Sequence, residues 1–202
     1  MKSLYHWVLS WAESPNGTRF MAFISFAESS FFPIPADPLL IALALGKIRK
    51  ALYFALVCTV ASVLGGVFGY LIGYFLWWSS PNEFSSIANF FFNNVPGFSI
   101  EVFRNVQQQY ESYNFLVIFL AAFTPIPYKV FSISAGAFFV NLPIFVIAST
   151  LGRRLRYFAL AFLIKIFGKP IKELLDKYFN LFIILLTILF IFSYFLVVYF
   201  FN

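Results

Sequence analysis

The sequence has little charge. Of its 202 residues, 14 are lysine or arginine and 8 are aspartate or glutamate, so charged residues make up 11% of the chain. A soluble domain has roughly a quarter. Apolar side chains make up 61% of the chain and include 31 phenylalanines. A domain of this size cannot bury so much apolar surface inside itself, so the composition excludes an ordinary soluble domain and predicts a membrane protein.

Cysteine and histidine are also scarce. The single Cys58 excludes an internal disulfide framework and a cysteine-based zinc site, and the single His6 excludes a histidine metal cluster. The sequence has no HExxH zinc motif and no GxSxG nucleophile motif. The three predicted spans, 51–80, 141–164 and 178–202, hold no aspartate that could form an intramembrane aspartyl dyad. We therefore expect no enzyme, no metal and no cofactor.

The net charge of +6 does not indicate nucleic acid as a partner. In a chain with so few charges, an excess of lysine and arginine is better explained by the positive-inside rule. These residues gather at 47–50 and 165–177, whereas the linker 81–111 is net acidic. The pattern predicts that both basic segments lie inside the cell and that the linker lies outside.

Three stretches are long and apolar enough to cross a bilayer, which takes about 20 mostly apolar residues. Residues 51–80 and 178–202 carry no charge, and residues 141–164 are apolar apart from one basic cluster. In the first of these spans, Gly65, Gly69 and Gly73 recur every four residues. Such a stripe of small residues is typical of close helix packing.

Two segments, 1–19 and the linker 81–111, are predicted to lie on the membrane surface. Each has apolar residues on one helical face, and the first has two tryptophans, which favour the boundary between water and lipid. Its apolar run is too short for a signal peptide. The two stripes consist of Leu4, Trp7, Val8 and Trp11, and of Phe84, Ile87, Ala88, Phe91 and Phe92.

Two further apolar segments, 20–46 and 112–140, are interrupted by prolines. Inside a helix a proline costs about 3 kcal/mol or more, so each segment is predicted to be a re-entrant hairpin of two half-helices. The sequence FFPIP at 31–35 aligns with FTPIP at 123–127, which indicates an internal repeat. The prolines at the two breaks are Pro33, Pro35, Pro125 and Pro127.

With one span between the two hairpins, the repeat is inverted, as in many transporters. The predicted fold is therefore an all-α membrane protein. It consists of an inverted repeat of two proline-broken re-entrant hairpins, about three transmembrane helices and interfacial amphipathic helices.

Six charged residues remain inside apolar segments. An isolated charge at the centre of a bilayer costs about 2.5 to 3.5 kcal/mol, so these residues need partners. Asp37 and Lys129 occupy equivalent positions in the two hairpins and are predicted to face each other. The six residues are Glu28, Asp37, Lys129, Arg153, Arg154 and Arg156.

Two of these features have simpler explanations. Asp37 followed by Pro38 is a normal helix start, with the aspartate as N-cap. The arginine cluster could be an inner-leaflet anchor. However, counted from Asn141 at 1.5 Å per residue, Arg153 lies about 18 Å into its helix, which favours a binding role. Arg153 and Arg156 share one helical face there, and Gly152 leaves room for a neighbouring backbone.

Four motifs in order resemble the DedA family, whose shared region is the VTT or SNARE-associated domain. They are FAESSFFPIPADPLL at 26–40, GYLIG at 69–73, FTPIP at 123–127 and GRRLRY at 152–157. The resemblance covers residues 20–165. It divides the chain into an N-terminal interfacial helix at 1–19, the membrane domain, and a basic linker with a C-terminal transmembrane helix at 166–202.

The resemblance implies a multi-pass protein of the bacterial inner membrane. It also implies recycling of the lipid carrier undecaprenyl phosphate, dependence on the proton-motive force, and phospholipid scrambling in eukaryotic relatives. Glu28 and Asp37 match the family's hairpin acids, and Arg153 and Arg156 match its Gly-Arg-x-x-Arg-Tyr pattern. The chain departs from the family at Ala122, where many members have arginine.

We therefore expect a flippase that moves an anionic lipid, a polyprenyl phosphate or a phospholipid. Glu28 and Asp37 would exchange protons, while a basic group would hold the phosphate. Two alternatives stay open, a proton-coupled carrier of a small ion or cation and a membrane assembly protein that transports nothing. The expected partners are membrane lipids and protons, and the oligomeric state is open, a homo-oligomer included. The basic group consists of Lys129, Arg153, Arg154 and Arg156.

Overall fold

The structure is a computed structural model that describes residues 16–32, 35–80, 83–94, 99–124, 126–168 and 170. The predicted interfacial helix at 1–19 lies outside this part up to residue 15, and the predicted span 178–202 lies wholly outside it. Pro33 and Pro125 also lie outside the described residues, whereas Pro35 and Pro127 lie within them.

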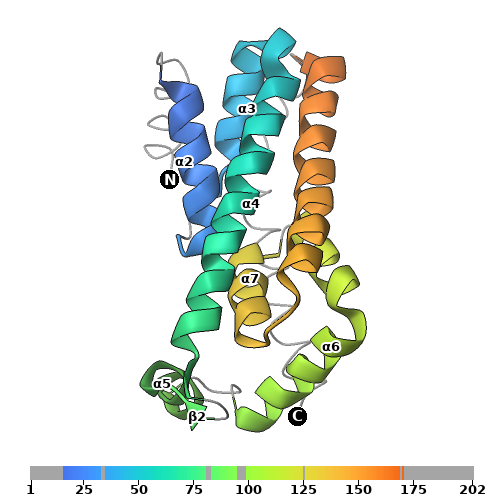
Figure 1. Cartoon of the computed structure of the whole chain (residues 1–202). Helices are drawn as coiled ribbons and strands as arrows, with labels where there is room; N and C mark the ends of the chain where they lie inside the picture. The colour runs from blue at the N-terminus through green and yellow to red at the C-terminus, as the bar shows by residue number, and fades with distance from the viewer. Residues whose placement is uncertain are drawn as a thin grey trace.

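Helices make up nearly all of the described chain, which confirms the predicted all-α class (Figure 1). The helices are α2 (Gly17–Ser30), α3 (Asp37–Gly46), the short 3-10 helix η1 (Ile48–Lys50), α4 (Ala51–Leu76), α5 (Ser86–Asn94), α6 (Ile100–Phe123), α7 (Tyr128–Ala137) and a last helix at residues 142–168. We call the last one the arginine helix, because it carries three arginines. Strands β1 (Trp78–Ser80) and β2 (Glu83–Phe84) pair antiparallel.

The long apolar helix α4 has no charged residue. Together with η1 it forms the segment Ile48–Leu76, which among the described residues is the one helix long and apolar enough to cross a membrane. The predicted span 51–80 was too long, because the chain after α4 turns into the β1–β2 hairpin. The arginine helix covers the predicted span 141–164, but its three arginines interrupt the apolar run.

Two broken segments pack against α4. The first broken segment is α2–α3, with its break at residues 31–36, and the second is α6–α7, with its break at 124–127. In Figure 1 the first lies in the upper half of the view and the second in the lower half. The two breaks meet, since Lys129 Nζ donates a hydrogen bond to the Phe32 carbonyl oxygen at 3.3 Å.

The glycines of α4 bring both broken segments close to it. Gly65 faces the backbone of Phe26 in α2, and Gly73 faces the backbone of Ile133 in α7. A Cβ atom at either glycine would overlap the neighbouring carbonyl group. Gly69 lies between them, against the Ser132 side chain. The stripe of small residues therefore allows two helices to pack at backbone distance along α4.

Helix α6 begins well before the predicted hairpin at 112–140. It starts at Ile100, inside the predicted surface linker, after Ser99 accepts a hydrogen bond from a backbone N–H of the first turn. It then bends at Tyr113, where the backbone is not helical (φ −133°, ψ 30°). The predicted boundary between linker and hairpin is thus a bend within one helix.

The amphipathic stripe of the linker packs largely against the protein. Ala88 is buried, Phe84 stacks on Trp78 and Phe92 contacts Trp77 edge to face. The β1–β2 hairpin folds the segment back onto the end of α4, while Ile87 and Phe91 of the same stripe are exposed, so its position on the membrane surface stays a prediction. The exposed apolar residues of α5 are Ile87, Phe90 and Phe91.

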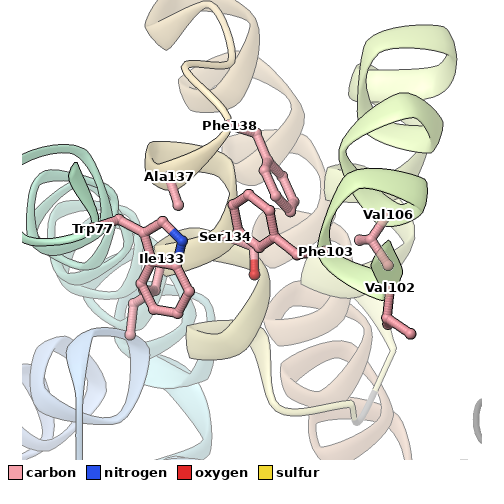
Figure 2. Close-up of a pocket in the computed structure, with 8 residues that line it drawn as sticks. All are labelled: Trp77, Val102, Phe103, Val106, Ile133, Ser134, Ala137 and Phe138. Carbon is pink, nitrogen blue, oxygen red and sulfur yellow. The ribbon is translucent and has the colours of Figure 1, made fainter. Parts of the chain in front are cut away.

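A small apolar cavity lies beside these aromatic rings, between the end of α4, the start of α6 and α7 (Figure 2). Its lining residues are Trp77, Val102, Phe103, Val106, Ile133, Ser134, Ala137 and Phe138. None of the six charged residues that the sequence analysis singled out lines it. The charged residues are therefore gathered elsewhere in the described chain.

Candidate functional site

The charged residues lie between two apolar clusters. The upper cluster joins the first broken segment and the first part of α4 to Ala161 of the arginine helix. The lower cluster joins the second broken segment and Tyr70 of α4 to Ala148 of the same helix. Arg153 and Arg156 fall between these two positions. Their carboxylate partners are Glu28 and Asp37. We call these four residues the charged layer, which lies between the two apolar clusters where the broken segments meet.

Asp37 and Arg156 form a hydrogen-bonded ion pair. Asp37 is the first residue of α3, and its side chain makes no cap hydrogen bond, so the simple N-cap explanation was wrong. Arg156 also donates a hydrogen bond to the Thr124 carbonyl oxygen at the end of α6. Arg156 therefore joins the start of α3 to the break of the second segment.

Glu28 and Arg153 form a looser ion pair, with 4.0 Å between Glu28 Oε1 and Arg153 Nη1. Glu28 Oε2 accepts a hydrogen bond from the backbone N–H of Ala36 at 2.8 Å, just before α3 begins. The Arg153 side chain is 2% exposed and that of Glu28 is 19% exposed. This pair holds together the two sides of the first break and the centre of the arginine helix.

Arg153 is held mainly by aromatic residues. Its guanidinium carbon lies 4.2 Å from the centre of the Tyr128 ring, and its Nη1 donates to the Tyr157 hydroxyl at 3.2 Å. Arg153 Nε is buried and has no hydrogen-bond partner among the described residues. Asp37 Oδ1 is also buried without one. The site thus keeps one donor and one acceptor unused.

Buried hydroxyl groups line the helices next to the charged layer. The Ser29 and Ser62 hydroxyls are hydrogen-bonded at 2.6 Å between α2 and α4. Ser132 of α7 donates to the Ser29 carbonyl oxygen at 3.3 Å. The bond from Ser30 to the Gly65 carbonyl oxygen at 3.0 Å also joins α2 to α4, so these polar contacts join the first broken segment to α4 and the second broken segment to the first.

Two predicted site residues are placed differently from the expectation. Lys129 forms no ion pair with Asp37: Asp37 Oδ2 pairs with Arg156, and Lys129 donates a hydrogen bond to the Phe32 carbonyl oxygen. Arg154 is exposed, with its guanidinium 5.4 Å from the Phe158 ring. It follows Arg153 by about 100° around the helix and so points away from the pair.

Sequence reasoning missed Tyr128, the Thr124 carbonyl and the buried serines. The only available signal was an aromatic residue directly before Lys129 in a broken segment. Gly152 behaves as expected, since a Cβ there would meet Ala122 and the Phe119 carbonyl of α6, each at 2.7 Å. The charged cluster itself contains two carboxylates and two guanidiniums, and the described residues hold no metal-binding group of three or more His, Cys, Asp or Glu.

Comparison with known proteins supports the resemblance to DedA proteins. The VTT domain matches residues 34–166. An uncharacterised protein of Haemophilus influenzae is 32% identical over 162 residues, which cover 79% of this chain and 78% of the relative. An uncharacterised protein of Histophilus somni is 27% identical over 176 residues, which cover 83% and 82%. No solved structure matches the chain. The chain therefore belongs to the VTT-domain family, the DedA proteins.

Proposed function

We propose that this protein moves an anionic lipid, a polyprenyl phosphate or a phospholipid, across the bacterial inner membrane as a multi-pass transporter. VTT-family membership suggests a transporter-like role in a membrane, in a family that is generally not enzymatic. The observation that carries the proposal is the charged layer between the broken segments, where two arginines each face a carboxylate. The lipid headgroup would enter this layer while its tail stays in the bilayer.

The arginines are suited to bind a phosphate group. A guanidinium offers several N–H donors in one plane and binds phosphate oxygens in pairs. Arg153 has a buried Nε without a partner among the described residues, and its carboxylate partner is not within hydrogen-bond distance. A phosphate oxygen can therefore bind Arg153 without first breaking a hydrogen bond to Glu28. Arg154 is left out of the proposed site because it points outward.

Protons would be coupled to the lipid through Glu28 and Asp37. A guanidinium that is paired with a carboxylate cannot give the same N–H groups to a phosphate. Protonation of the carboxylate removes the attraction and frees the arginine. In this proposal the headgroup binds as the acids take up protons from one side, and the acids release them on the other side when they pair again with Arg153 and Arg156.

The two broken segments would act as opposed re-entrant hairpins related by an inverted repeat. Their breaks meet, and the segments extend into opposite halves of the molecule in Figure 1. In transporters built from inverted repeats, rocking of one repeat against the other opens the shared site to each side in turn. The ion pairs between the first broken segment and the arginine helix are the contacts that such a motion would have to break.

The proposal is tested in liposomes that contain fluorescently labelled undecaprenyl phosphate or phosphatidylglycerol. The access of a quencher to the headgroups measures their movement between leaflets. We expect Arg153→Ala and Glu28→Gln to slow this movement at least about tenfold, which corresponds to about 1.4 kcal/mol. Arg154→Ala is the matched control, because it removes the same charge one residue away. Equal rates in all four proteins would show that the proposed site is wrong.

A structural role without transport is the second candidate. It is favoured by the fact that each arginine already faces a carboxylate, as in a static membrane-embedded ion pair. Exchange of the charges, with Asp37→Arg and Arg156→Asp combined, distinguishes the two. A static pair should work in cells in either orientation, whereas a phosphate site needs its arginine on the arginine helix. A cation carrier has less support, since neither carboxylate is free of an arginine.

A further inference from the structure

Tyr128 lies against the Arg153 guanidinium. It is the first residue of α7, directly after the break of the second broken segment, and it is 2% exposed. The Arg153 guanidinium carbon lies over its ring, 4.2 Å from the ring centre, whereas Glu28 Oε1 lies 4.0 Å from Arg153 Nη1, beyond hydrogen-bond distance. A cation over an aromatic face within about 6 Å is attracted by the ring, most strongly where water is excluded.

The Tyr128 ring is fixed from three sides. Its hydroxyl is hydrogen-bonded to that of Ser149, one helical turn before Arg153 on the arginine helix. Gly66 of α4 lies behind it, where an added Cβ would be 2.8 Å from Tyr128 Cε1. The Phe145 ring is stacked at 6.3 Å with an interplanar angle of 17°. A ring held in this way cannot turn aside without disturbing α4 or the arginine helix.

The two arginines therefore use their donors differently. Arg156 donates hydrogen bonds from its guanidinium to the Asp37 carboxylate and to the Thr124 carbonyl oxygen. The Arg153 guanidinium carbon lies over the Tyr128 ring, a contact that occupies no hydrogen-bond donor, and Arg153 Nη1 donates one hydrogen bond to Tyr157. Arg153 Nε is left buried and without a hydrogen-bond partner among the described residues, and the contact with the ring restrains the direction in which it points.

We propose that Tyr128 is a positioning residue for the phosphate site. Its ring holds the Arg153 guanidinium so that the unused N–H edge faces the headgroup, and through it the second broken segment controls how tightly Arg153 binds. This inference rests on the proposed function above. It assigns to the second segment, which has no carboxylate in the charged layer, a share in recognising the anion.

Three variants separate the ring from the hydroxyl. Tyr128→Leu removes the ring, Tyr128→Phe keeps the ring and removes its hydrogen bond, and Ser149→Ala removes the same hydrogen bond from the other side. A desolvated contact between a cation and a ring is worth about 2 kcal/mol, which is about 30-fold in affinity. We expect Tyr128→Leu to raise the half-saturating content of labelled phosphatidylglycerol in liposomes by about 10- to 30-fold.

The maximal rate should change less than this half-saturating content. Tyr128→Phe and Ser149→Ala should stay within about twofold of the unchanged protein, because the ring remains in place. The inference is overturned if Tyr128→Leu keeps the half-saturating content of the unchanged protein. It is also overturned if Tyr128→Phe raises the half-saturating content as much as Tyr128→Leu does, because the effect would then come from the hydroxyl and not from the ring.

A spectroscopic readout makes the result independent of transport. In protein labelled with ¹⁵N-arginine, a proton next to an aromatic face is shifted upfield, and Arg153→Lys identifies the Nε–H signal. This shift should persist in Tyr128→Phe and disappear in Tyr128→Leu. Gly66→Ala, which pushes the ring from α4, should reduce it even if Tyr128→Leu does not fold. If the unchanged protein moves no lipid, the proposed function fails, while a shift that survives Tyr128→Leu and Gly66→Ala overturns the positioning role separately.

Discussion

The two broken segments have the same proline pattern but contribute different chemistry to the centre of the molecule. The first, α2–α3, contributes both carboxylates of the charged layer, Glu28 and Asp37. The second, α6–α7, contributes an aromatic face from Tyr128 and the carbonyl oxygen of Thr124. The two segments thus share a proline motif in the sequence but do not contribute the same chemical groups.

The arginine helix connects the two segments, because each of its two inward arginines contacts both. Arg153 meets Glu28 of the first segment and Tyr128 of the second. Arg156 meets Asp37 of the first and the Thr124 carbonyl of the second. In the proposed mechanism, protonation of Glu28 or Asp37 would weaken the ion pairs to the first segment and leave the contacts of the arginines with Tyr128 and the Thr124 carbonyl in place.

The largest effect is expected from breaking the attachment of the first segment. Asp37→Asn leaves Arg156 without its carboxylate, and removing one partner of a buried ion pair costs about 3–5 kcal/mol. Asp37 and Arg156 side chains keep 21% and 15% exposure, so we expect about 2–3 kcal/mol. The measurement is the free energy of unfolding in mixed detergent micelles.

A double-mutant cycle tests the origin of that loss. Asp37→Asn and Arg156→Gln together should show a larger coupling energy than Glu28→Gln and Arg153→Gln together, because only the first pair is hydrogen-bonded. Equal coupling in the two cycles would contradict the distinction between a tight and a loose pair.

A smaller effect is expected from the packing of the second segment on α4. Gly73→Ala places a methyl group against the Ile133 carbonyl of α7, and overpacking of this kind costs about 1–3 kcal/mol. Gly65→Ala does the same to the first segment at Phe26. We expect Gly73→Ala to lower the thermal midpoint more, because within the described residues both ion pairs of the arginine helix go to the first segment and none to the second.

Gly46→Ala is the control for both variants. Nothing lies within 4 Å of the position its Cβ would take, so this substitution should leave the thermal midpoint nearly unchanged. If Gly65→Ala lowered the thermal midpoint more than Gly73→Ala, the first segment would depend on its packing against α4 more than on its ion pairs.

The sequence predicted those parts of the fold that depend on local chemistry. Prolines locate both breaks, and the uncharged run locates α4. The boundaries were less accurate where tertiary contacts decide. The end of α4 is set by the pairing of Trp78 with Phe84, and the start of α6 lies at Ser99 in a segment whose amphipathic pattern suggested only a surface helix.

The candidate site shows the same division. The cost of a charge in an apolar segment depends on each residue alone, and it selected the four paired residues Glu28, Asp37, Arg153 and Arg156 together with Lys129 and Arg154, which form no ion pair among the described residues. Their pairing depends on where the arginine helix passes between the broken segments, which no local pattern encodes. For this reason Lys129 was assigned to Asp37, and the aromatic face of Tyr128 was not anticipated.

The smallest effect is expected at the direct contact between the two breaks. Lys129→Met removes a hydrogen bond of 3.3 Å from a partly exposed lysine to the Phe32 carbonyl, which should lower the free energy of unfolding by about 0.5–1 kcal/mol. Lys165→Met, at an exposed lysine near the end of the arginine helix, controls for the loss of a positive charge. If Lys129→Met lowered the free energy of unfolding as much as Asp37→Asn, the result would favour the pairing of Lys129 with Asp37 that the sequence predicts. A small loss would leave Arg156 as the residue on which the first segment depends.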